Sequence, residues 1–262
     1  MYPVLFRLGS HVIDTYTVVW AFSLALALAW TRNRSSRIYG LADEDARVVL
    51  FWGFLGILAG ARLGNILMDW RAYAENPYRL LRPWEGGLSA LPAIIGGGLA
   101  AMAVLKRKKI PVWPLAEAAS LPAAALVAFG RWGCLAQGCC YGERTALPWG
   151  IRFPAEAAGI SRHPTQLYES LAAFGLWVLL FLVERKLANR PERPAAAVLW
   201  PLFLAGYGAI RLVEDRFRGD VSFDSPVGWF WSLADFLLGV AWLFASLRGL
   251  ARERGEGEGG RG

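Results

Sequence analysis

Apolar residues along the chain gather in long runs that are separated by short polar and basic segments. A helix needs about 20 mainly apolar residues to cross the hydrocarbon core of a bilayer, and seven runs approach or exceed that length. They span residues 14–31, 48–69, 87–105, 111–130, 166–183, 195–213 and 227–247. Glycine and proline interrupt the third and fourth runs. The pattern predicts an all-α integral membrane protein with about seven transmembrane helices.

Lysine and arginine are concentrated in alternate connections between these runs. They are dense in segments 32–47, 106–109 and 185–193 and in the tail after residue 247. If all seven runs cross the membrane, these segments lie on one side of it. The positive-inside rule makes that side cytoplasmic, so the pattern predicts an outer N-terminus and an inner C-terminus.

The composition agrees with a membrane protein and argues against a nucleic-acid-binding protein. Hydrophobic residues make up 55% of the 262, which exceeds the usual share in a soluble domain. The net charge of +7 comes mainly from the connections, and no basic face on a soluble domain suggests nucleic-acid binding. We expect one membrane domain over residues 1–250 and a disordered cytoplasmic tail over the glycine-rich residues 251–262.

Several ionisable residues interrupt the apolar runs, although each costs about 3 kcal/mol near the bilayer centre. Arg62 lies inside the second run, and Glu85 stands near the start of the third. Arg131, His163 and a polar group near the end of the sixth run map to one depth in the outer half. That group comprises Tyr207, Arg211, Glu214 and Asp215. Two arginines at one depth predict an anionic ligand, because guanidinium groups bind phosphate oxygens in pairs, and a lipid head group lies at that depth.

Each of these residues also has a purely structural interpretation. Arg62 can pair with Asp69 or with the glutamate near the start of the third run. Arg211 and Asp215 are four residues apart and can neutralise each other across one helical turn. His163 precedes a proline and suits the first turn of a helix. The convergence of several helices at one depth is what favours a site.

Glycine is dense around the third run, at residues 86–87 and 96–98, with Pro92 between them. We expect these residues to break or kink the helix. Non-helical backbone is tolerated in a membrane where it is buried in protein or lines a cavity. Close packing of small residues between helices is the competing explanation.

All three cysteines of the chain, Cys134, Cys139 and Cys140, fall within seven residues. On the outer side of a membrane this spacing allows a disulfide, a metal or redox site, or small packing residues at a helix end. The sequence does not choose among the three, and we assign neither a metal nor a cofactor. We expect a serine at position 140 to be tolerated and a serine at position 139 not; equal loss from both would indicate a metal or redox cluster.

Short motifs spread over the chain resemble one enzyme family. They are G-A-R-L-G-N (60–65), W-E-G-G-L-S (84–89), G-R-W-G-C-L-A-Q-G-C-C-Y-G (130–142), L-P-W-G-I-R-F-P (147–154), H-P-T-Q-L-Y-E (163–169) and G-Y-G-A-I-R (206–211). In order and spacing they are similar to the phosphatidylglycerol–prolipoprotein diacylglyceryl transferases. The resemblance covers essentially the whole chain, including the seven-helix arrangement.

The resemblance implies a multi-pass enzyme of the bacterial inner membrane whose active site lies in the outward-facing half. Its partners would be phosphatidylglycerol and the lipobox peptide of a preprolipoprotein. The enzyme would move the diacylglyceryl group to the thiol of the lipobox cysteine and release glycerol phosphate. Such a reaction needs arginines for the leaving phosphate and a base that makes a thiolate.

Family roles carry over to the positions that match. The resemblance places a lipid-binding arginine at Arg131 and an essential arginine and tyrosine at Arg211 and Tyr207. Tyr16 matches a tyrosine of the first helix, and Asp215 a late acidic position for which the adjacent glutamate competes. The expected catalytic group is Tyr16, His163, Tyr207, Arg211, Glu214 and Asp215. The expected phospholipid-binding group is Arg62, Glu85, Arg131, Cys134, Cys139, Gly142, Gln166 and Tyr168.

Three positions near the expected chemistry depart from the family pattern. Leu91 stands where the resemblance places a catalytic histidine, and Cys134 and Cys139 replace an asparagine and a glutamate. Two hypotheses follow. The chain is a transferase with a substitute base, drawn from the histidine, acidic and cysteine residues named above, and with its own choice of acceptor, or it is a silent relative that binds anionic lipid. A transporter is disfavoured, because no inverted repeat is evident.

Overall fold

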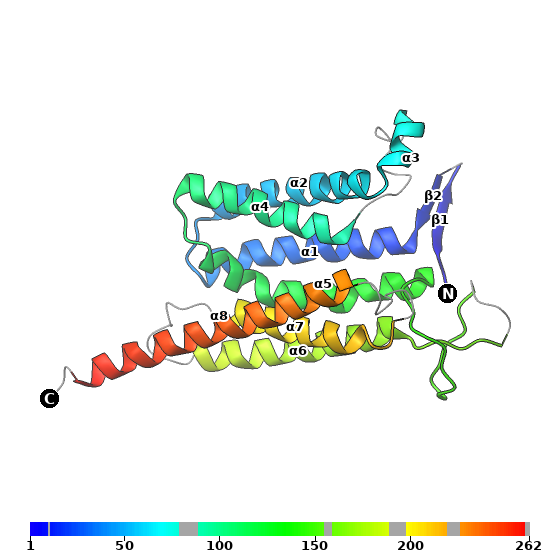
Figure 1. Ribbon diagram of the computed structural model, residues 1–262. Coiled ribbons are helices and arrows are strands. Elements are labelled where there is room, and N and C mark those ends of the chain that lie inside the picture. The colour runs from blue at the N-terminus through cyan, green and yellow to red at the C-terminus, as the bar shows by residue number, and fades with distance from the viewer. Residues whose placement is uncertain (10, 79–88, 155–158, 189–197, 219–225, 260–262) are drawn as a thin grey trace. The chain divides into compact units, whose positions relative to one another are not determined.

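The computed structural model describes residues 1–9, 11–78, 89–154, 159–188, 198–218 and 226–259. Seven long helices account for most of these residues and match the seven apolar runs (Figure 1). They are α1 (Thr15–Arg37), α2 (Asp43–Met68), α4 (Ala90–Lys108), α5 (Trp113–Gln137), α6 (Thr165–Ala188), α7 (Leu199–Glu214) and α8 (Pro226–Gly259). A short helix, α3 (Trp70–Glu75), follows α2.

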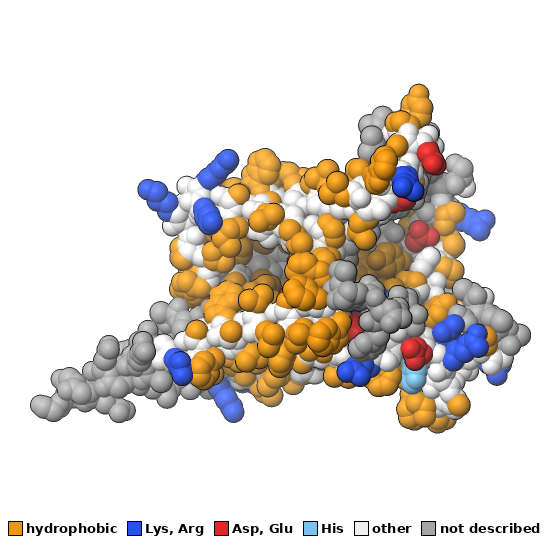
Figure 2. Space-filling model, viewed as in Figure 1, with side chains coloured by type: hydrophobic (Ala, Val, Ile, Leu, Met, Phe, Trp, Pro, Cys, Tyr) orange, Lys and Arg blue, Asp and Glu red, His pale blue; other side chains and the backbone are white. Residues whose placement is uncertain are grey.

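The helices have the character of an integral membrane protein. Four described segments are long and apolar enough to cross a membrane: Asp43–Met68, Trp113–Gln137, Thr165–Leu187 and Trp229–Gly249. Large apolar side chains are exposed along them, among them Phe51, Leu58 and Leu171. Figure 2 shows hydrophobic side chains along the exposed lengths of α2, α4 and α8, with lysine and arginine near helix ends. Such a surface suits lipid, because water would make it costly.

A small β-hairpin precedes the first helix, which the expectation of an all-α chain missed. Strand β1 (Val4–Leu8) pairs antiparallel with β2 (His11–Asp14), and Val4 lies opposite Asp14. The chain passes from β2 straight into α1, where the Thr15 amide donates to the Pro3 carbonyl oxygen at 3.0 Å. Two strands of four or five residues give too short an alternating pattern to stand out in the sequence.

The chain forms two compact units. One comprises Met1–Thr31 and Ala116–Gly262, and the other comprises Arg32–Leu115. The predicted domain over residues 1–250 includes all of the unit Arg32–Leu115 and most of the other unit, and its predicted end falls within α8. The division of the chain into one membrane domain and a disordered tail therefore stays a prediction.

The unit Arg32–Leu115 is built on the pairing of α2 with α4. Glycines of α2 face small residues of α4, so that the two backbones touch. A Cβ on Gly56 would collide with the Gly96 carbonyl oxygen, and one on Gly60 with the Pro92 carbonyl oxygen. The expectation that Pro92 and residues 96–98 break the third helix is wrong, because α4 is helical throughout residues 90–108. A kink, the other expected outcome, stays a prediction. Proline fits the first turn of a helix, and the glycines serve close packing. Residues 86–87 lie outside the described residues.

The other unit packs α5, α6 and α7 around a shared apolar core. Its fully or nearly fully buried members are Leu121, Ala124, Leu176, Leu180, Leu199 and Phe203. Helix α8 lies against α7, where Gly239 lies against the backbone of Ala205. At one end of this core, Glu117 of α5 accepts hydrogen bonds from the first amides of α7, Leu199 (3.1 Å) and Trp200 (2.9 Å). A carboxylate of α5 therefore caps the N-terminus of α7 and complements its dipole.

Candidate active site

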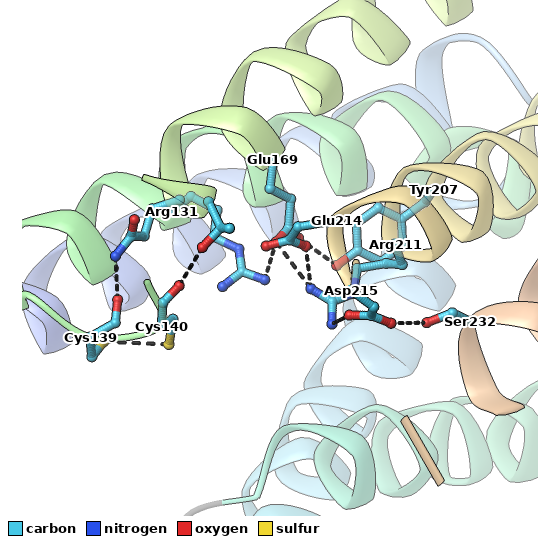
Figure 3. A network of polar contacts seen from close by, with 11 residues as sticks. Arg131, Cys139, Cys140, Glu169, Tyr207, Arg211, Glu214, Asp215 and Ser232 are labelled. Carbon is cyan, nitrogen blue, oxygen red and sulfur yellow. Dashed lines mark hydrogen bonds and ion pairs between the residues drawn. The ribbon is translucent and has the colours of Figure 1, made fainter. Parts of the chain in front are cut away.

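The polar centre of this unit is Glu169, whose side chain on α6 is fully buried. Arg131 of α5 forms an ion pair with Glu169 Oε2, and Arg211 Nη1 of α7 lies 3.2 Å from the same oxygen. The Tyr207 hydroxyl donates to Oε1 at 2.9 Å. Figure 3 shows Glu169 between the two arginines, with Tyr207 on the Arg211 side. Three helices thus converge on one carboxylate.

Arg211 is also held from its own helix. Its Nη1 donates to Glu214 Oε2, and its Nη2 donates to Asp215 Oδ1 at 2.8 Å. The other oxygen of Asp215 accepts from Ser232 of α8 at 3.0 Å. Spacings of three and four residues put Tyr207, Arg211 and the two acids on one face of α7 and its C-terminal end. The position of Arg211 is therefore fixed by contacts with α6, α7 and α8.

The charges of this network compensate one another in a nearly dry setting. Two arginines face three carboxylates, and the acids are 0–2% exposed. Buried charges of this kind are tolerated only when they are paired and hydrogen-bonded. The guanidinium groups reach further outward, with the side chain of Arg131 12% and that of Arg211 19% exposed. Such an arrangement holds arginine donors rigidly where a phosphate oxygen can meet them.

Tyr16 belongs to the same side of the unit as Arg131. Helix α1 lies against α5 at Gly130 and Gly133, where a Cβ would meet the Trp20 ring and the Tyr16 carbonyl oxygen. The Tyr16 hydroxyl lies within electrostatic range of Arg131 and of all three cysteines. Its side chain is partly exposed, and its ring is tilted against Trp20.

The start of α6 holds the loop that follows α5. Thr165 Oγ1 donates to the Cys140 carbonyl oxygen at 2.7 Å, and Gln166 Nε2 donates to the Cys139 carbonyl oxygen at 2.5 Å. The Nε2 donor of Gln166 is thereby engaged by the loop, whereas its buried Oε1 has no hydrogen-bond partner among the described residues. A lipid-binding role for Gln166 stays a prediction. The three cysteines are not bridged. Hydrogen bonding with Cys134, together with burial, raises the pKa of the Cys139 and Cys140 thiols.

Gly142 closes this loop against two other segments. Its amide donates to the His163 carbonyl oxygen at 2.8 Å, and a Cβ at this position would collide with the Phe217 carbonyl oxygen. The next amide, of Glu143, donates to that same Phe217 oxygen at 2.7 Å. The structure therefore gives Gly142 a close-packing role between the loop, the start of α6 and the end of α7.

His163 and Tyr168 belong to an aromatic group beside the network. His163 Nδ1 lies 3.1 Å from the Tyr168 hydroxyl, which also accepts from Trp149 Nε1 at 2.8 Å. The rings of His163 and Tyr168 both pack against Phe217. Among the contacts of the described residues, none joins the His163 or Tyr168 side chain to Glu169 or the arginines.

The remaining expected residues belong to the unit Arg32–Leu115 or lie outside the described chain. The Arg62 guanidinium lies over the Tyr73 ring at 5.2 Å, and the Tyr73 hydroxyl donates to Asn65 at 2.7 Å. Leu91 is in the first turn of α4 and partly exposed. Glu85 lies outside the described residues.

Comparison with known proteins decides the family. The family model for prolipoprotein diacylglyceryl transferase matches residues 3–245. The chain belongs to this family. Curated relatives named phosphatidylglycerol–prolipoprotein diacylglyceryl transferase include one from Geobacter sulfurreducens, 34% identical over 91% of this chain and 92% of the relative. One from Trichormus variabilis is 33% identical over 95% and 92%, and one from Bordetella parapertussis is 31% identical over 91% and 92%.

The family and the transferase class predicted from the motifs are therefore confirmed. Glu169 was nevertheless not among the residues expected at the site, although Arg131, Tyr207 and Arg211 converge on its carboxylate. A signal was present, because Glu169 ends the H-P-T-Q-L-Y-E motif inside an apolar run. It also lies three and four residues after Gln166 and Thr165, on the face of α6 that continues into the buried stripe of Ala173, Leu176 and Leu180. An acid on a buried helix face needs a cationic partner.

Proposed function

We propose that the chain transfers the diacylglyceryl group of phosphatidylglycerol to the thiol of the lipobox cysteine of a preprolipoprotein. The names of the curated relatives support this function. The single structural observation that carries it is the convergence of Arg131 and Arg211 on the buried Glu169 carboxylate. A site that already holds one oxyanion between two arginines has the donors that a phosphodiester requires.

The two arginines have different roles in this proposal. Arg211 is held by three carboxylates, so it acts mainly to fix Glu169 and the end of α7. Arg131 has a single ion pair among the described residues, with Glu169. Its remaining guanidinium donors are the ones that bind the phosphate of the lipid. As the phosphate leaves it gains charge, and a fixed guanidinium stabilises that charge more than the ground state.

In the transfer step, the cysteine sulfur attacks the glycerol carbon that carries the phosphate ester. A carbon–sulfur bond forms, the carbon–oxygen bond breaks, and glycerol phosphate leaves with the electron pair. The thiol proton must pass to a base before or during this step. Leu91 has no ionisable group for this purpose.

We assign the proton-accepting role to Glu214. Its Oε1 atom is buried and has no hydrogen-bond partner among the described residues, whereas both oxygens of Asp215 accept hydrogen bonds, from Arg211 and Ser232. We expect Glu214→Gln to lower kcat more than Asp215→Asn does. A larger loss from His163→Phe than from either would move the role to His163.

We also propose seven membrane spans, with the N-terminus outside and the site in the outward-facing half of a bacterial plasma membrane. The last turns of α1, α4 and α6 all carry basic residues. These three helices run in the same direction if every long helix crosses the membrane, which puts their basic ends on one side, as the positive-inside rule requires. Reporter fusions at positions 41 and 110 should then report a cytoplasmic location, and fusions at position 145 an outer one.

The experiment that tests the function is a direct transfer assay. Purified protein in micelles containing phosphatidylglycerol receives a lipobox peptide, and mass spectrometry detects the diacylglyceryl adduct on its cysteine together with released glycerol phosphate. We expect an adduct from the parent and from Leu91→Ala, and none from Arg131→Ala. Phosphatidylglycerol binding without an adduct would contradict the proposed transfer and support a silent lipid-binding relative. An undiminished adduct from Arg131→Ala would refute the role of this arginine.

A further inference from the structure

The three cysteine thiols form a cluster that the proposed transfer does not use. Cys134 lies in the last turns of α5, and Cys139 and Cys140 follow in the loop after it. The three Sγ atoms lie within 4.8 Å of one another, and those of Cys139 and Cys140 are 3.5 Å apart. Cys134 is buried, and the other two are partly exposed. Figure 3 shows Cys139 and Cys140 beneath the Arg131 side chain.

The backbone around the cluster is held in a shape that brings the thiols together. The Cys139 amide donates back to the Cys134 carbonyl oxygen at 3.2 Å, and Gly138 and Cys140 both have positive φ, 75° and 62°. A side chain rarely adopts that conformation without a compensating interaction. Thr165 and Gln166 hold the carbonyl oxygens of Cys140 and Cys139. The backbone that carries Cys139 and Cys140 is therefore held from outside the loop, which limits where their thiols can lie.

The distances suit a single thiolate-bound ion. Zn²⁺ binds thiolates at about 2.3 Å in tetrahedral geometry, which separates the sulfur atoms by about 3.8 Å. The three sulfurs need to move by only about 1 Å at most to meet this value. Cysteine thiolates select soft cations such as Zn²⁺ and Cu⁺, and the chain has no other cysteine.

The surrounding charge favours a divalent ion. Three thiolates and Zn²⁺ leave one net negative charge, and Arg131 stands one turn before Cys134 on α5, within electrostatic range of it. A monovalent ion would leave two negative charges beside one arginine. The partial exposure of Cys139 and Cys140 leaves the fourth tetrahedral position to water. Tyr16, one of the expected catalytic residues, lies on α1, and its carbonyl oxygen faces Gly133 of α5, the residue before Cys134.

We propose that Cys134, Cys139 and Cys140 bind one thiophilic divalent cation of the Zn²⁺ class. The ion joins the end of α5 to the loop that α6 holds. In doing so it fixes the helix turn that carries Arg131 relative to α6, which carries Glu169. The cation displaces the thiol protons to solvent on binding, and no redox step is involved.

Metal binding by the full chain in detergent tests the proposal. The reduced protein is freed of reductant and titrated with Co²⁺ and then Zn²⁺, and the bound zinc is counted by elemental analysis. We expect a sulfur-to-cobalt charge-transfer band, its loss on addition of zinc, and one zinc per chain. Cys134→Ser, Cys139→Ser and Cys140→Ser should each weaken binding by at least about 100-fold, whereas His163→Ala should keep both the band and the stoichiometry.

Thiol protection in the parent protein gives a readout that needs no variant. Bound Zn²⁺ should slow alkylation of all three cysteines together, as followed by mass spectrometry. Equal alkylation with and without zinc, or zinc bound equally by the serine variants, would overturn the proposal. A disulfide within the cluster that forms in the presence of zinc would overturn it in favour of a redox pair. None of these outcomes depends on transferase activity, so failure here is distinct from failure of the proposed function.

Discussion

Two groups of helices in this chain are held together by opposite means. Helices α2 and α4 meet through glycine and proline, with backbone against backbone. Helices α5, α6 and α7 meet around an apolar core that contains a charged network centred on Glu169. Inside a membrane both solutions work, because dispersion contacts and internally paired polar groups each replace the hydrophobic driving force that lipid does not supply.

The two regions should therefore respond to different kinds of substitution, one to changes in side-chain size and the other to changes in charge. The α2–α4 contact depends on side-chain size where the glycines of α2 meet the backbone of α4, so an added atom matters there. An ion pair between Lys108 and Asp45 also joins the two helices near one end. The Glu169 network depends on charge balance, so removing one member leaves the others buried without partners. Substitutions that change only size or only charge should therefore separate the two regions.

The largest expected effect is that of Glu169→Ala. It leaves Arg131 without its carboxylate and deprives Arg211 of one of three. Breaking a buried ion pair costs about 3–5 kcal/mol, so we expect lost transfer activity and a strongly lowered thermal unfolding temperature in micelles. Ser170→Ala, at the next position, is the matched control. It removes one hydrogen bond, from Ser170 Oγ to the Ala128 carbonyl oxygen, and should keep most activity. Equal effects of the two substitutions would mean that charge pairing does not matter here.

Gly60→Leu should be the next most damaging change. Its Cβ alone would collide with the Pro92 carbonyl oxygen, and overpacking of this kind costs about 3 kcal/mol at the upper end of its usual range. Gly98→Ala is the control, since nothing lies within 4 Å of its Cβ position. Alanine in a helix is favoured over glycine by about 1 kcal/mol, so this variant should be neutral or stabilised. Denaturation in mixed micelles measures both, and a stable Gly60→Leu would refute the close packing of α2 on α4.

Glu117→Ala tests a carboxylate that binds no cation among its described contacts. It removes the acceptor of the first two α7 amides, Leu199 and Trp200. Leaving buried donors unsatisfied costs about 2 kcal/mol. We expect lower stability but an unchanged KM for phosphatidylglycerol, because the cap lies at the opposite end of α7 from Arg211. Glu117→Gln retains one acceptor and should recover about half of the loss. A raised KM with normal stability would contradict the capping role.

Ser232→Ala should have the smallest effect. It removes the hydrogen bond to Asp215 Oδ2, and a hydrogen bond between helices in a membrane contributes about 0.6–1 kcal/mol. Asp215 keeps Arg211 as a partner, so activity should fall less than twofold. Ser246→Ala, farther along α8, is the control for loss of a serine hydroxyl. A large loss of activity from Ser232→Ala would mean that α8 takes a direct part in the chemistry.

The sequence predicted the helices better than it predicted their contacts. The seven apolar runs coincide with the seven long helices. Four described segments are long and apolar enough to cross a membrane, and a span for each of the seven stays a prediction. The structure also joins Arg131, Tyr207, Arg211, Glu214 and Asp215 in one network around Glu169. Their common depth in a membrane stays a prediction. Spacing along one helix, and distance from the end of an apolar run, can both be counted directly in the sequence.

The features that the sequence did not predict are contacts between residues that lie far apart in the chain. Glu169 was missed because its importance comes from α5 and α7, which approach it only in the fold. Residues 96–98 were expected to break or kink a helix, but α4 is continuous across them, and Gly96 and Gly97 lie against the backbone and side chains of α2. His163 was grouped with the site by depth, and depth does not tell which way a side chain points.

The loop after α5 is held by its main chain, and this has a consequence for how the site can change. Thr165 and Gln166 bind carbonyl oxygens of residues 139 and 140, and carbonyl oxygens are present whichever amino acids stand there. Mutation can therefore exchange the side chains at these two positions while the loop keeps its path. The path of the loop therefore does not depend on which side chains stand at residues 139 and 140. An ancestor with other residues at these positions can gain cysteines there without losing the fold.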